Sequence, residues 1–283
     1  MKKKNWLAMV LIGLSLAALV GYHFWDRVRT DTVPPQLTVD GETLEVSVYD
    51  DSTALLQGIV ARDNRDGDVT SGLIVEHVGL VNSEGDAIVR YAAVDSSGNV
   101  AKISRNIRYT DYESPKFSLT APLQFAAGSG FEVVDLVKAQ DVLEGDISHR
   151  VRAASQSDKA LADVGMYDVQ FKVTNALGDT REVVLQVELY LAGSYNAELS
   201  LDEYLIYLPV GARFDAKSYL KEFRYSSKRE SLSRGIPEGY HLDMTGTVNT
   251  GIPGVYEVKY TMDYVQGSQT YTGASRLVVI VEE

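Results

Sequence analysis

A glycine–aromatic–glycine pattern occurs three times in this chain, and it constrains the fold more than any other feature of the sequence. In each set the aromatic residue follows the first glycine by six positions and precedes the second by seven. The three sets are Gly85, Tyr91 and Gly98; Gly165, Phe171 and Gly178; and Gly254, Tyr260 and Gly267. Two other strings recur about 80 residues apart: residues 31–35 return at 111–115, and residues 61–70 return at 139–148. Most of the chain is therefore one structural unit repeated three times.

The segments between these glycines alternate between apolar and polar residues. Two sets of alternate residues that share one face of an extended chain are Tyr167, Val169, Phe171 and Val173, and Tyr256, Val258, Tyr260 and Met262. This period of two, with β-branched and aromatic residues, predicts half-buried β-strands. The second glycine of each set falls in a turn between two strands, where a hairpin requires a positive φ. The repeats therefore predict an all-β chain of tandem β-sandwiches.

The first 30 residues have a different character. Residues 6–25 contain no charged side chain, and a helix of this length spans about 30 Å, the thickness of a bilayer core. Because three lysines precede this run, we expect a cytoplasmic basic tail at residues 1–5 and a transmembrane signal anchor at residues 6–25. The protein would then be a single-pass cell-membrane protein with a cytoplasmic N-terminus and an extracellular C-terminal ectodomain. A cleaved signal peptide, or an amphipathic or buried helix, is the alternative.

Four strings of the first repeat resemble a known family. They are DTVPP at 31–35, ARDNRDGDVT at 61–70, GDAIVRYAAVDSSGNVAKISR at 85–105 and YTD at 109–111. Through them the chain is similar to the immunoglobulin-like domains of bacterial surface proteins and of a pesticidal crystal protein. The resemblance is weaker in the second repeat, where ALGD replaces SSGN, and in the third it depends on residues 210–220 and 248–267.

This resemblance implies three tandem seven-stranded immunoglobulin-like β-sandwiches, at residues 31–110, 111–189 and 190–283, the third being divergent and longer. It also implies a stalk or interaction module without catalytic activity. The sequence itself contains no nucleotide-binding, zinc-protease or nucleophile-elbow motif, so we expect that the protein is not an enzyme.

Composition excludes further classes of function. The chain has no cysteine, which rules out disulfides, thiolate catalysis and iron–sulfur clusters. Its net charge is −12, and residues 1–30 carry five basic side chains against one acidic, so the remainder carries −16. Nucleic acid is therefore not expected as a partner, because phosphate binding needs clustered basic residues.

Carboxylates crowd one segment of the first repeat, and they predict a structural calcium site, although no cofactor is required. Calcium accepts six to eight oxygen ligands in loose geometry. The candidate ligands are Asp63, Asp66, Asp68, Asp95, Asn99 and Asp111. The alternative is that these carboxylates accept hydrogen bonds from backbone amides in turns and hold no ion. The second repeat offers Asp141, Glu144, Asp146 and Asn175, whereas in the third Tyr264 replaces Asp95 and the site should be lost.

A basic, aromatic segment in the third repeat is the second candidate site. Its residues are Lys217, Tyr219, Lys221, Phe223, Arg224, Tyr225, Lys228 and Arg229. Arginine and tyrosine are favoured at interface centres, so this segment predicts a contact with an extracellular protein or a cell-wall glycan. The alternative is a solvated loop or short helix whose aromatic side chains pack inward.

Together these features predict a noncatalytic, membrane-anchored adhesion or stalk protein that presents its last domain for a protein or glycan contact at the cell surface. One alternative is a carbohydrate-binding surface protein that uses the tyrosines of the third repeat as a stacking platform. Another is an accessory subunit of an envelope assembly, because Gly13, Ala17 and Gly21 would permit close approach of a second helix.

Overall fold

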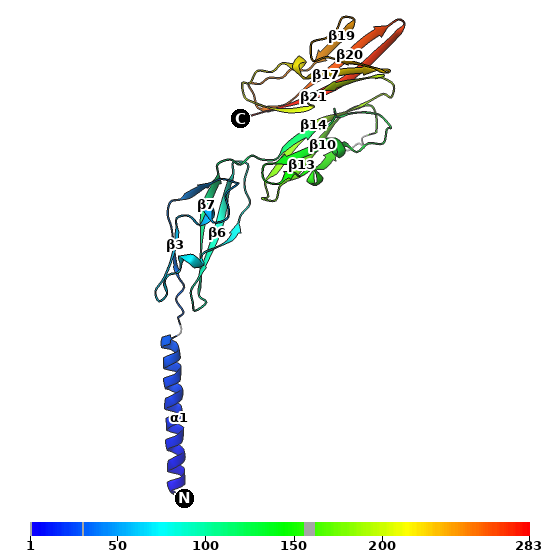
Figure 1. Cartoon of the computed structure of the whole chain (residues 1–283). Coiled ribbons are helices and arrows are strands. Elements are labelled where there is room, and N and C mark those ends of the chain that lie inside the picture. The colour runs from blue at the N-terminus through cyan, green and yellow to red at the C-terminus, as the bar shows by residue number, and fades with distance from the viewer. Residues whose placement is uncertain (1, 30, 156–161) are drawn as a thin grey trace. The chain divides into compact units, whose positions relative to one another are not determined.

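A computed structural model of the chain describes residues 2–29, 31–155 and 162–283, and within the N-terminal helix it describes the side chains of Trp6, Met9–His23 and Trp25. The chain divides into two compact units, Met1–Tyr112 and Glu113–Glu283. The first unit contains helix α1 (Lys2–Arg29) and one β-sandwich, and the second unit contains two β-sandwiches (Figure 1).

The structure corrects the prediction for the N-terminal helix. Among the residues that the structure describes, no helix combines the length and the apolar character needed to cross a bilayer. The prediction of a transmembrane anchor at residues 6–25, and with it a single-pass membrane protein with an extracellular C-terminal part, is therefore wrong. An uncharged run is not equivalent to a continuously apolar one, and residues 6–25 include Gly13, Ser15, Gly21 and His23. The basic tail predicted at residues 1–5 lies outside the described side chains.

The first sandwich packs a three-stranded sheet against a four-stranded sheet. Its strands are β1 (Gln36–Val39), β2 (Thr43–Val46), β3 (Ile59–Asp63), β4 (Gly67–Asp68), β5 (Ile74–Val78), β6 (Asp86–Val94) and β7 (Val100–Tyr109), with short 3-10 turns η1 (Ala54–Leu56) and η2 (Thr70–Gly72). The two sheets have the strand orders β1-β3-β4 and β2-β7-β6-β5.

The second sandwich repeats this arrangement. Its strands are β8 (Lys116–Leu119), β9 (Gln124–Ala126), β10 (Val137–Asp141), β11 (Gly145–Asp146), β12 (Arg152–Ser155), β13 (Gly165–Thr174) and β14 (Thr180–Tyr190), with 3-10 turns η3 (Val133–Leu136) and η4 (Ser148–Arg150). The sheet orders are β8-β10-β11 and β9-β14-β13-β12.

The third sandwich has the same two sheets with longer hairpin strands. Its strands are β15 (Ala197–Leu201), β16 (Leu205–Pro209), β17 (Leu220–Tyr225), β18 (Lys228–Ser231), β19 (Tyr240–Thr245), β20 (Gly254–Gln266) and β21 (Gln269–Glu282), with the 3-10 turn η5 (Ala216–Tyr219). The sheet orders are β15-β17-β18 and β16-β21-β20-β19.

The three sandwiches share one topology. In each, the second strand pairs in parallel with the last strand, as β2 does with β7, β9 with β14 and β16 with β21. The remaining pairings within the sheets are antiparallel, as in the long hairpin of β20 and β21. The prediction of an all-β chain of tandem immunoglobulin-like sandwiches is confirmed at this level.

The repeated glycines and aromatic residues have the structural roles that their spacing predicts. Tyr91, Phe171 and Tyr260 are fully buried in the centres of the three cores. The second glycines, Gly98, Gly178 and Gly267, have φ values of +88°, +84° and +64°. An L-residue rarely adopts such values, which explains why glycine occupies the turn of each hairpin.

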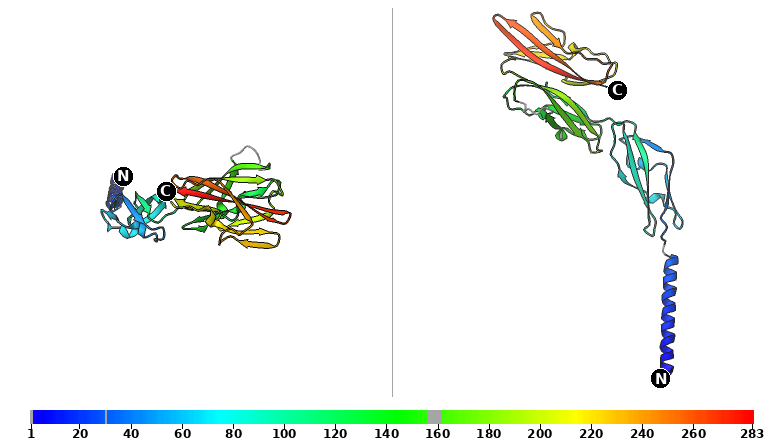
Figure 2. Two further views of the ribbon diagram at one scale, coloured as in Figure 1. Left: turned by 90° about the horizontal axis from the view of Figure 1, so that it is seen from above. Right: turned by 180° about the vertical axis from the view of Figure 1, so that it is seen from behind.

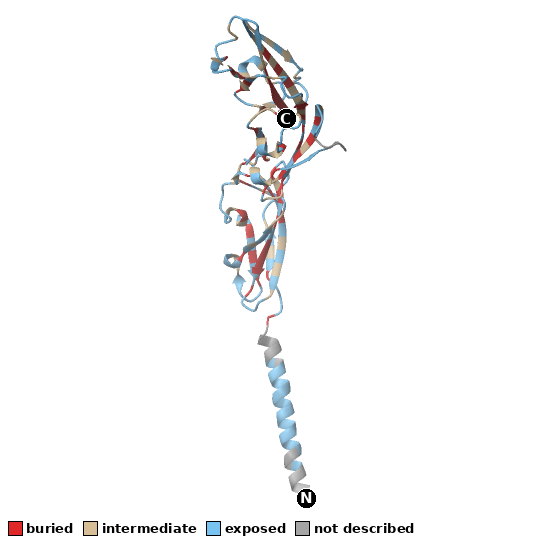
Figure 3. Cartoon of the chain, turned by 90° about the vertical axis from the view of Figure 1, so that its right-hand side faces the viewer, coloured by how far each residue is buried: buried red, intermediate tan, exposed pale blue. Residues whose placement is uncertain are grey.

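The second and third sandwiches share part of their cores and form one compact unit. Strand β21 is buried on both faces: Leu277, Val279 and Val281 belong to the core of the third sandwich, whereas Val278 and Ile280 pack into the core of the second. The two sandwiches lie next to each other in the right-hand view of Figure 2 and share buried residues. Buried residues, red in Figure 3, follow the inner strands of the sandwiches, whereas the described side chains of α1 are exposed.

Candidate functional site

Three aspartates converge in the first sandwich. Asp31 precedes β1, Asp63 ends β3 and Asp95 follows β6, and one carboxylate oxygen of each lies within 4.8 Å of the other two. The three side chains belong to buried residues, with exposed fractions of 5%, 8% and 6%. We call this group the aspartate triad. Three buried carboxylates at this spacing repel one another unless a positive charge lies among them.

Backbone amides fix the orientation of each carboxylate. The first oxygen (Oδ1) of each aspartate accepts hydrogen bonds from the amides that follow it. These bonds join Asp31 to Val33 (3.0 Å), Asp63 to Arg65 (2.8 Å) and Asp66 (2.9 Å), and Asp95 to Ser97 (2.9 Å) and Asn99 (2.8 Å). Because Oδ1 is held in a turn in each case, the second oxygens are left for other partners.

The second oxygens have unequal surroundings. Asp95 Oδ2 accepts a hydrogen bond from the Asn99 amide at 2.6 Å, and Asp31 Oδ2 lies 3.7 Å from the Arg65 guanidinium. Asp63 Oδ2 is buried and has no hydrogen-bond partner among the described residues. A buried carboxylate oxygen without a donor is unfavourable, so this atom requires an explanation.

Hydrogen bonds keep two of these carboxylates, Asp63 and Asp95, ionised in spite of their burial. Hydrogen bonds from the Asp66 and Arg65 amides hold the pKa of Asp63 below its usual range, although the charge of Asp95 opposes this shift. Burial by itself would raise the pKa of Asp95, but the hydrogen bonds from Asn99, Ser97 and Gly98 outweigh it and lower that pKa. At neutral pH both side chains are therefore anions.

The other aspartates predicted as calcium ligands do not belong to the triad, and each accepts hydrogen bonds from other residues. Asp66 accepts hydrogen bonds from the Ser96 amide (2.7 Å) and hydroxyl (2.8 Å), and Asp68 accepts one from the Thr70 amide at 2.9 Å. Asp111 binds the Ser47 hydroxyl (2.6 Å) and the Val48 amide (2.8 Å). These three carboxylates therefore accept hydrogen bonds from backbone amides, as the alternative to a calcium site predicts.

The sequence predicts Asp63 and Asp95 as ligands, and the fold adds Asp31, which completes the group. A signal was available, since Asp31 begins the string that recurs at Asp111. The Asn99 amide lies beside the triad, donating both to Asp95 and to the Asp31 carbonyl oxygen (3.2 Å).

In the second sandwich, a side-chain amide donates to the carboxylate oxygen that corresponds to Asp63 Oδ2. Asn175 replaces the carboxylate of Asp95, and its side-chain amide donates to Asp141 Oδ2 at 2.9 Å. Asp179 replaces Asn99, and its Oδ2 accepts a hydrogen bond from the Ser114 hydroxyl at 2.6 Å. Glu144 and Asp146, also named as candidates, bind Arg150 (2.6 Å) and the Ser148 amide (2.9 Å).

In the third sandwich, aromatic rings fill the same position. Tyr225 ends β17 as Asp63 ends β3, and Tyr264 replaces Asp95. The rings of Tyr225 and Tyr264 lie 4.9 Å apart, and Tyr240 stacks on Tyr264 at 4.3 Å. This arrangement has no carboxylate at either position, as expected from Tyr264.

The basic segment of the third sandwich does not form an aromatic surface. Phe223 and Tyr225 are buried in the core, because alternate residues of β17 face inward. Tyr219 is half-buried and packs against the same core. These aromatic side chains therefore pack inward, as the alternative to an exposed contact surface predicts.

Most of the basic side chains in this segment face acidic partners. Arg224 pairs with Glu198, Lys221 lies 3.8 Å from Asp202, and Arg229 lies 4.0 Å from Glu222. Lys228 lies over the ring of Tyr225, and Lys217 is exposed. The segment is thus a surface of mixed charge rather than a continuous basic patch.

Lys221 and Arg229 line a groove between the second and third sandwiches. The groove has a volume of about 560 Å³. It is lined by Leu119 and Thr120 of the second sandwich and by Ser200, Leu201, Asp202, Tyr204, Lys221, Glu222 and Arg229 of the third. We call it the junction groove. Its walls carry both signs of charge together with hydroxyl groups, a surface suited to a polar ligand.

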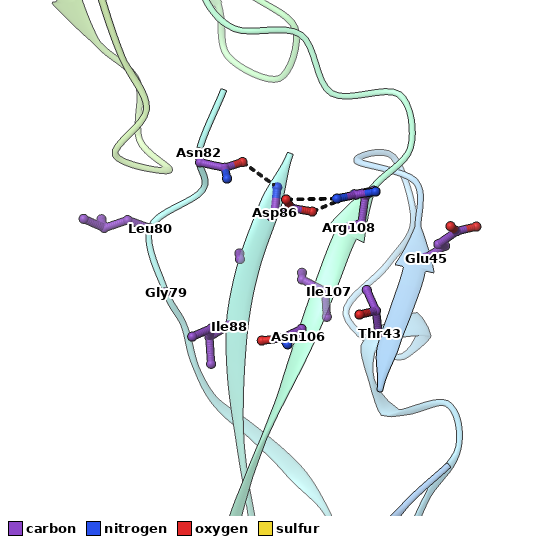
Figure 4. Close-up of a pocket in the computed structure, with 11 residues that line it drawn as sticks. Thr43, Glu45, Gly79, Leu80, Asn82, Asp86, Ile88, Asn106, Ile107 and Arg108 are labelled. Carbon is purple, nitrogen blue, oxygen red and sulfur yellow. Dashed lines mark hydrogen bonds and ion pairs between the residues drawn. The ribbon is translucent and has the colours of Figure 1, made fainter. Parts of the chain in front are cut away.

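A second hollow of about 670 Å³ lies on the outer face of the first sandwich (Figure 4). Asp86 and Arg108 point toward each other there and form two hydrogen bonds, of 2.7 and 3.1 Å, while the Asp86 amide donates to Asn82. This bidentate pair is shorter than the ion pairs of the junction groove, which measure 3.8 and 4.0 Å, so its charges exchange less readily for a ligand.

Comparisons with known proteins give no family. No family model matches the chain, and no curated protein matches it significantly. Among solved structures, it is similar to cadherin domains 1–5 of protocadherin gamma B2 (10% identity, 88% of this chain and 60% of that chain, TM-score 0.20). It is also similar to Drosophila N-cadherin EC1-4 (13% identity, 79% and 63%, TM-score 0.23).

A third structure contains CBM51-2, in complex with GlcNAc, and INT domains from Clostridium perfringens ZmpB (18% identity, 87% of this chain and 42% of that chain, TM-score 0.22). The chain spans less than two thirds of each of these three structures. TM-scores near 0.2 are too low to support a conclusion about this chain's function.

Proposed function

We propose that this protein is a noncatalytic binding protein, in which the second and third sandwiches act as one rigid body and hold a protein or a glycan in the junction groove. The observation that carries this proposal is the interface between the two sandwiches. An interface with a shared apolar core and a buried ionic network keeps a groove at its edge in a fixed shape, which lowers the entropic cost of binding.

A buried ionic network forms the centre of this interface. Arg276 of β21 is 5% exposed and binds Glu257 of its own sandwich and Glu188 of the second sandwich, the latter at 2.9 Å. Lys259 also binds Glu188, at 2.6 Å. Two cations thus neutralise two carboxylates across the junction.

Neutral hydrogen bonds flank this network. The Gln124 side chain donates to the Ala274 carbonyl oxygen at 2.7 Å, and the Phe117 amide donates to the Tyr207 hydroxyl at 2.8 Å. Arg181 of the second sandwich pairs with Glu282 of the third. With the shared apolar core, these contacts support a single body rather than two sandwiches on a hinge.

The junction groove fits a binding role better than catalysis. Its two carboxylates, Asp202 and Glu222, lie close to Lys221 and Arg229, and the residues that line the groove include no histidine to act as a base. Such exposed pairs are weak and can exchange one partner for a charged or hydroxylated ligand.

The test compares two double variants of the full chain. Lys221→Glu with Arg229→Glu reverses the charge of the groove, whereas Lys217→Glu with Lys228→Glu makes the same change in net charge outside it. Binding is measured to insoluble cell-wall glycan, to a printed glycan array and, by crosslinking, to proteins of a cell lysate. We expect at least a tenfold loss for the groove variant on one probe and little change for the control. Equal behaviour of both variants on every probe would contradict the proposal.

A further inference from the structure

We propose that the aspartate triad of the first sandwich binds one calcium ion, and that the second and third sandwiches have lost this site. The proposal concerns a different part of the chain from the junction groove and does not depend on it. Its basis is the convergence of three buried carboxylates together with the partnerless, buried oxygen of Asp63.

The spacing of the oxygens fits one cation. Calcium binds oxygen at about 2.3–2.6 Å, so two oxygens on the same ion lie at most about 5 Å apart. The triad oxygens lie within 4.8 Å of one another. An ion among them would give Asp63 Oδ2 a ligand partner in place of the hydrogen bond that it lacks among the described residues.

The donor set selects the kind of metal. The triad offers carboxylate oxygen alone, which suits hard cations rather than zinc or copper. Magnesium requires nearly ideal octahedral geometry, whereas calcium tolerates irregular ligand positions. Because each carboxylate is already fixed by backbone amides through its Oδ1, the ligands cannot rearrange freely, and calcium is the better match.

The second sandwich provides an internal comparison. There the oxygen that corresponds to Asp63 Oδ2 accepts a hydrogen bond from the Asn175 amide, so an amide takes the place that the ion would fill in the first sandwich. In the third sandwich the rings of Tyr225 and Tyr264 occupy the position. The second site thus differs from the first in three ways: Asn175 replaces Asp95, Asp179 replaces Asn99, and Asp111, the counterpart of Asp31, binds Ser47 and Val48 instead.

Calcium at this site would tie the N-terminal segment to the sandwich. Asp31 lies on the segment that precedes β1, while Asp63 and Asp95 lie at the ends of β3 and β6, on the two different sheets. One ion thus joins both sheets and the start of the chain's first sandwich. Removing the ion would leave that segment held by the Asp31–Arg65 pair, the Asn99 bond and the local turn.

The test is calcium titration of the full chain by isothermal titration calorimetry, with Asp95→Asn as the diagnostic variant. We expect the wild-type chain to bind one calcium with a dissociation constant of roughly 10⁻⁴–10⁻³ M, and magnesium at least tenfold more weakly. Asp95→Asn should weaken calcium binding at least tenfold. The introduced amide can donate to Asp63 Oδ2 as Asn175 does to Asp141, but the bond from the Asn99 amide to Asp95 Oδ2 is lost, so the melting temperature in chelator is measured to check that the variant folds.

Asp66→Asn is the matched control, since it removes a neighbouring carboxylate that lies outside the triad and should leave the affinity within about threefold of wild type. The proposal is overturned if the wild-type chain gives no saturable binding at millimolar calcium. It is also overturned if Asp95→Asn binds as tightly as Asp66→Asn, or if magnesium binds as tightly as calcium.

Discussion

Replacing Arg276 by glutamine should destabilise the second unit strongly, because it removes the central cation of the interface between the second and third sandwiches. Burial by itself would lower the pKa of Arg276, but the bonds and charges of Glu257 and Glu188 outweigh it and raise that pKa. The guanidinium is therefore charged at neutral pH. Without it, Glu188 keeps Lys259, whereas Glu257 loses its cation.

The magnitude follows from the exposure of the partners. Removing one member of a buried ion pair costs about 3–5 kcal/mol because the other charge is left uncompensated. The side chains of Glu188 and Glu257 are 13% and 21% exposed, so some water reaches both. Since Lys259 still neutralises Glu188, we expect the lower end of this range, about 3 kcal/mol.

The assay is equilibrium unfolding of the full chain in urea, followed by circular dichroism in the transition of the second unit. Arg224→Gln is the control, because Arg224 makes a similar pair with Glu198 but the two side chains are 40% and 57% exposed. An exposed pair contributes about 0–1 kcal/mol. If Arg276→Gln costs less than about 1 kcal/mol, or no more than Arg224→Gln, the interface is not held by this network.

Three further predictions concern the repeated unit. Gly85 has a φ of +82°, and an added Cβ would lie 2.6 Å from the Tyr109 carbonyl oxygen. Gly98 has a similar φ of +88°, but its added Cβ would meet nothing, so Gly85→Ala should lower the melting temperature more than Gly98→Ala. Equal effects of the two substitutions would contradict this account of the close contact. The Tyr91 hydroxyl donates to the Leu55 carbonyl oxygen at 2.8 Å, so Tyr91→Phe should cost about 1 kcal/mol of stability in urea unfolding. Phe171 is fully buried at the equivalent position of the second sandwich, which indicates that a phenylalanine ring fits there. An unchanged unfolding midpoint would show that this hydrogen bond is not stabilising. Hydroxyl hydrogen bonds from Ser47 and Ser148 hold the pKa values of Asp111 and Asp146 below the usual range, so the contribution of the two carboxylates to stability is complete above the unfolded pKa of about 3.9 and is lost as the pH falls through the lower folded pKa values. The double variant Asp111→Asn with Asp146→Asn should therefore show a flatter fall in stability between about pH 5 and pH 2. An unchanged slope would show that these two groups do not contribute to the acid sensitivity.

The architecture was predictable because its signals are local. Period-two alternation marks each long strand, and Gly98, Gly178 and Gly267 mark the hairpin turns through their positive φ. The contact between the second and third sandwiches also has a local signal in the sequence. Residues 277–281 form a continuous apolar run, which indicates a strand buried on both faces rather than on one.

The candidate sites were less predictable because they depend on which side chains face each other. Asp66 and Asp68 are neighbours of Asp63 in sequence, but in a tight turn they point to other partners. Asp31 joins the triad only because the fold brings the start of β1 beside β3 and β6. The aromatic residues of the basic segment follow the period-two rule: Phe223 and Tyr225 alternate along a strand, which places both side chains inside.

The second unit offers a direct measurement of whether its two sandwiches form one body. The chain has no cysteine, so spin labels can be attached to introduced cysteines without removing any native one. Lys138→Cys with Lys228→Cys places labels on exposed positions of the second and third sandwiches, and Lys138→Cys with Lys172→Cys places both on the second. Electron–electron double resonance then gives the distance distribution of each pair.

We expect a single distribution between the two sandwiches that is as narrow as the one within the second sandwich, and we expect Arg276→Gln to broaden it. A broad or multimodal distribution between the sandwiches in the otherwise unmodified chain would contradict the central claim that they present the junction groove as one rigid body.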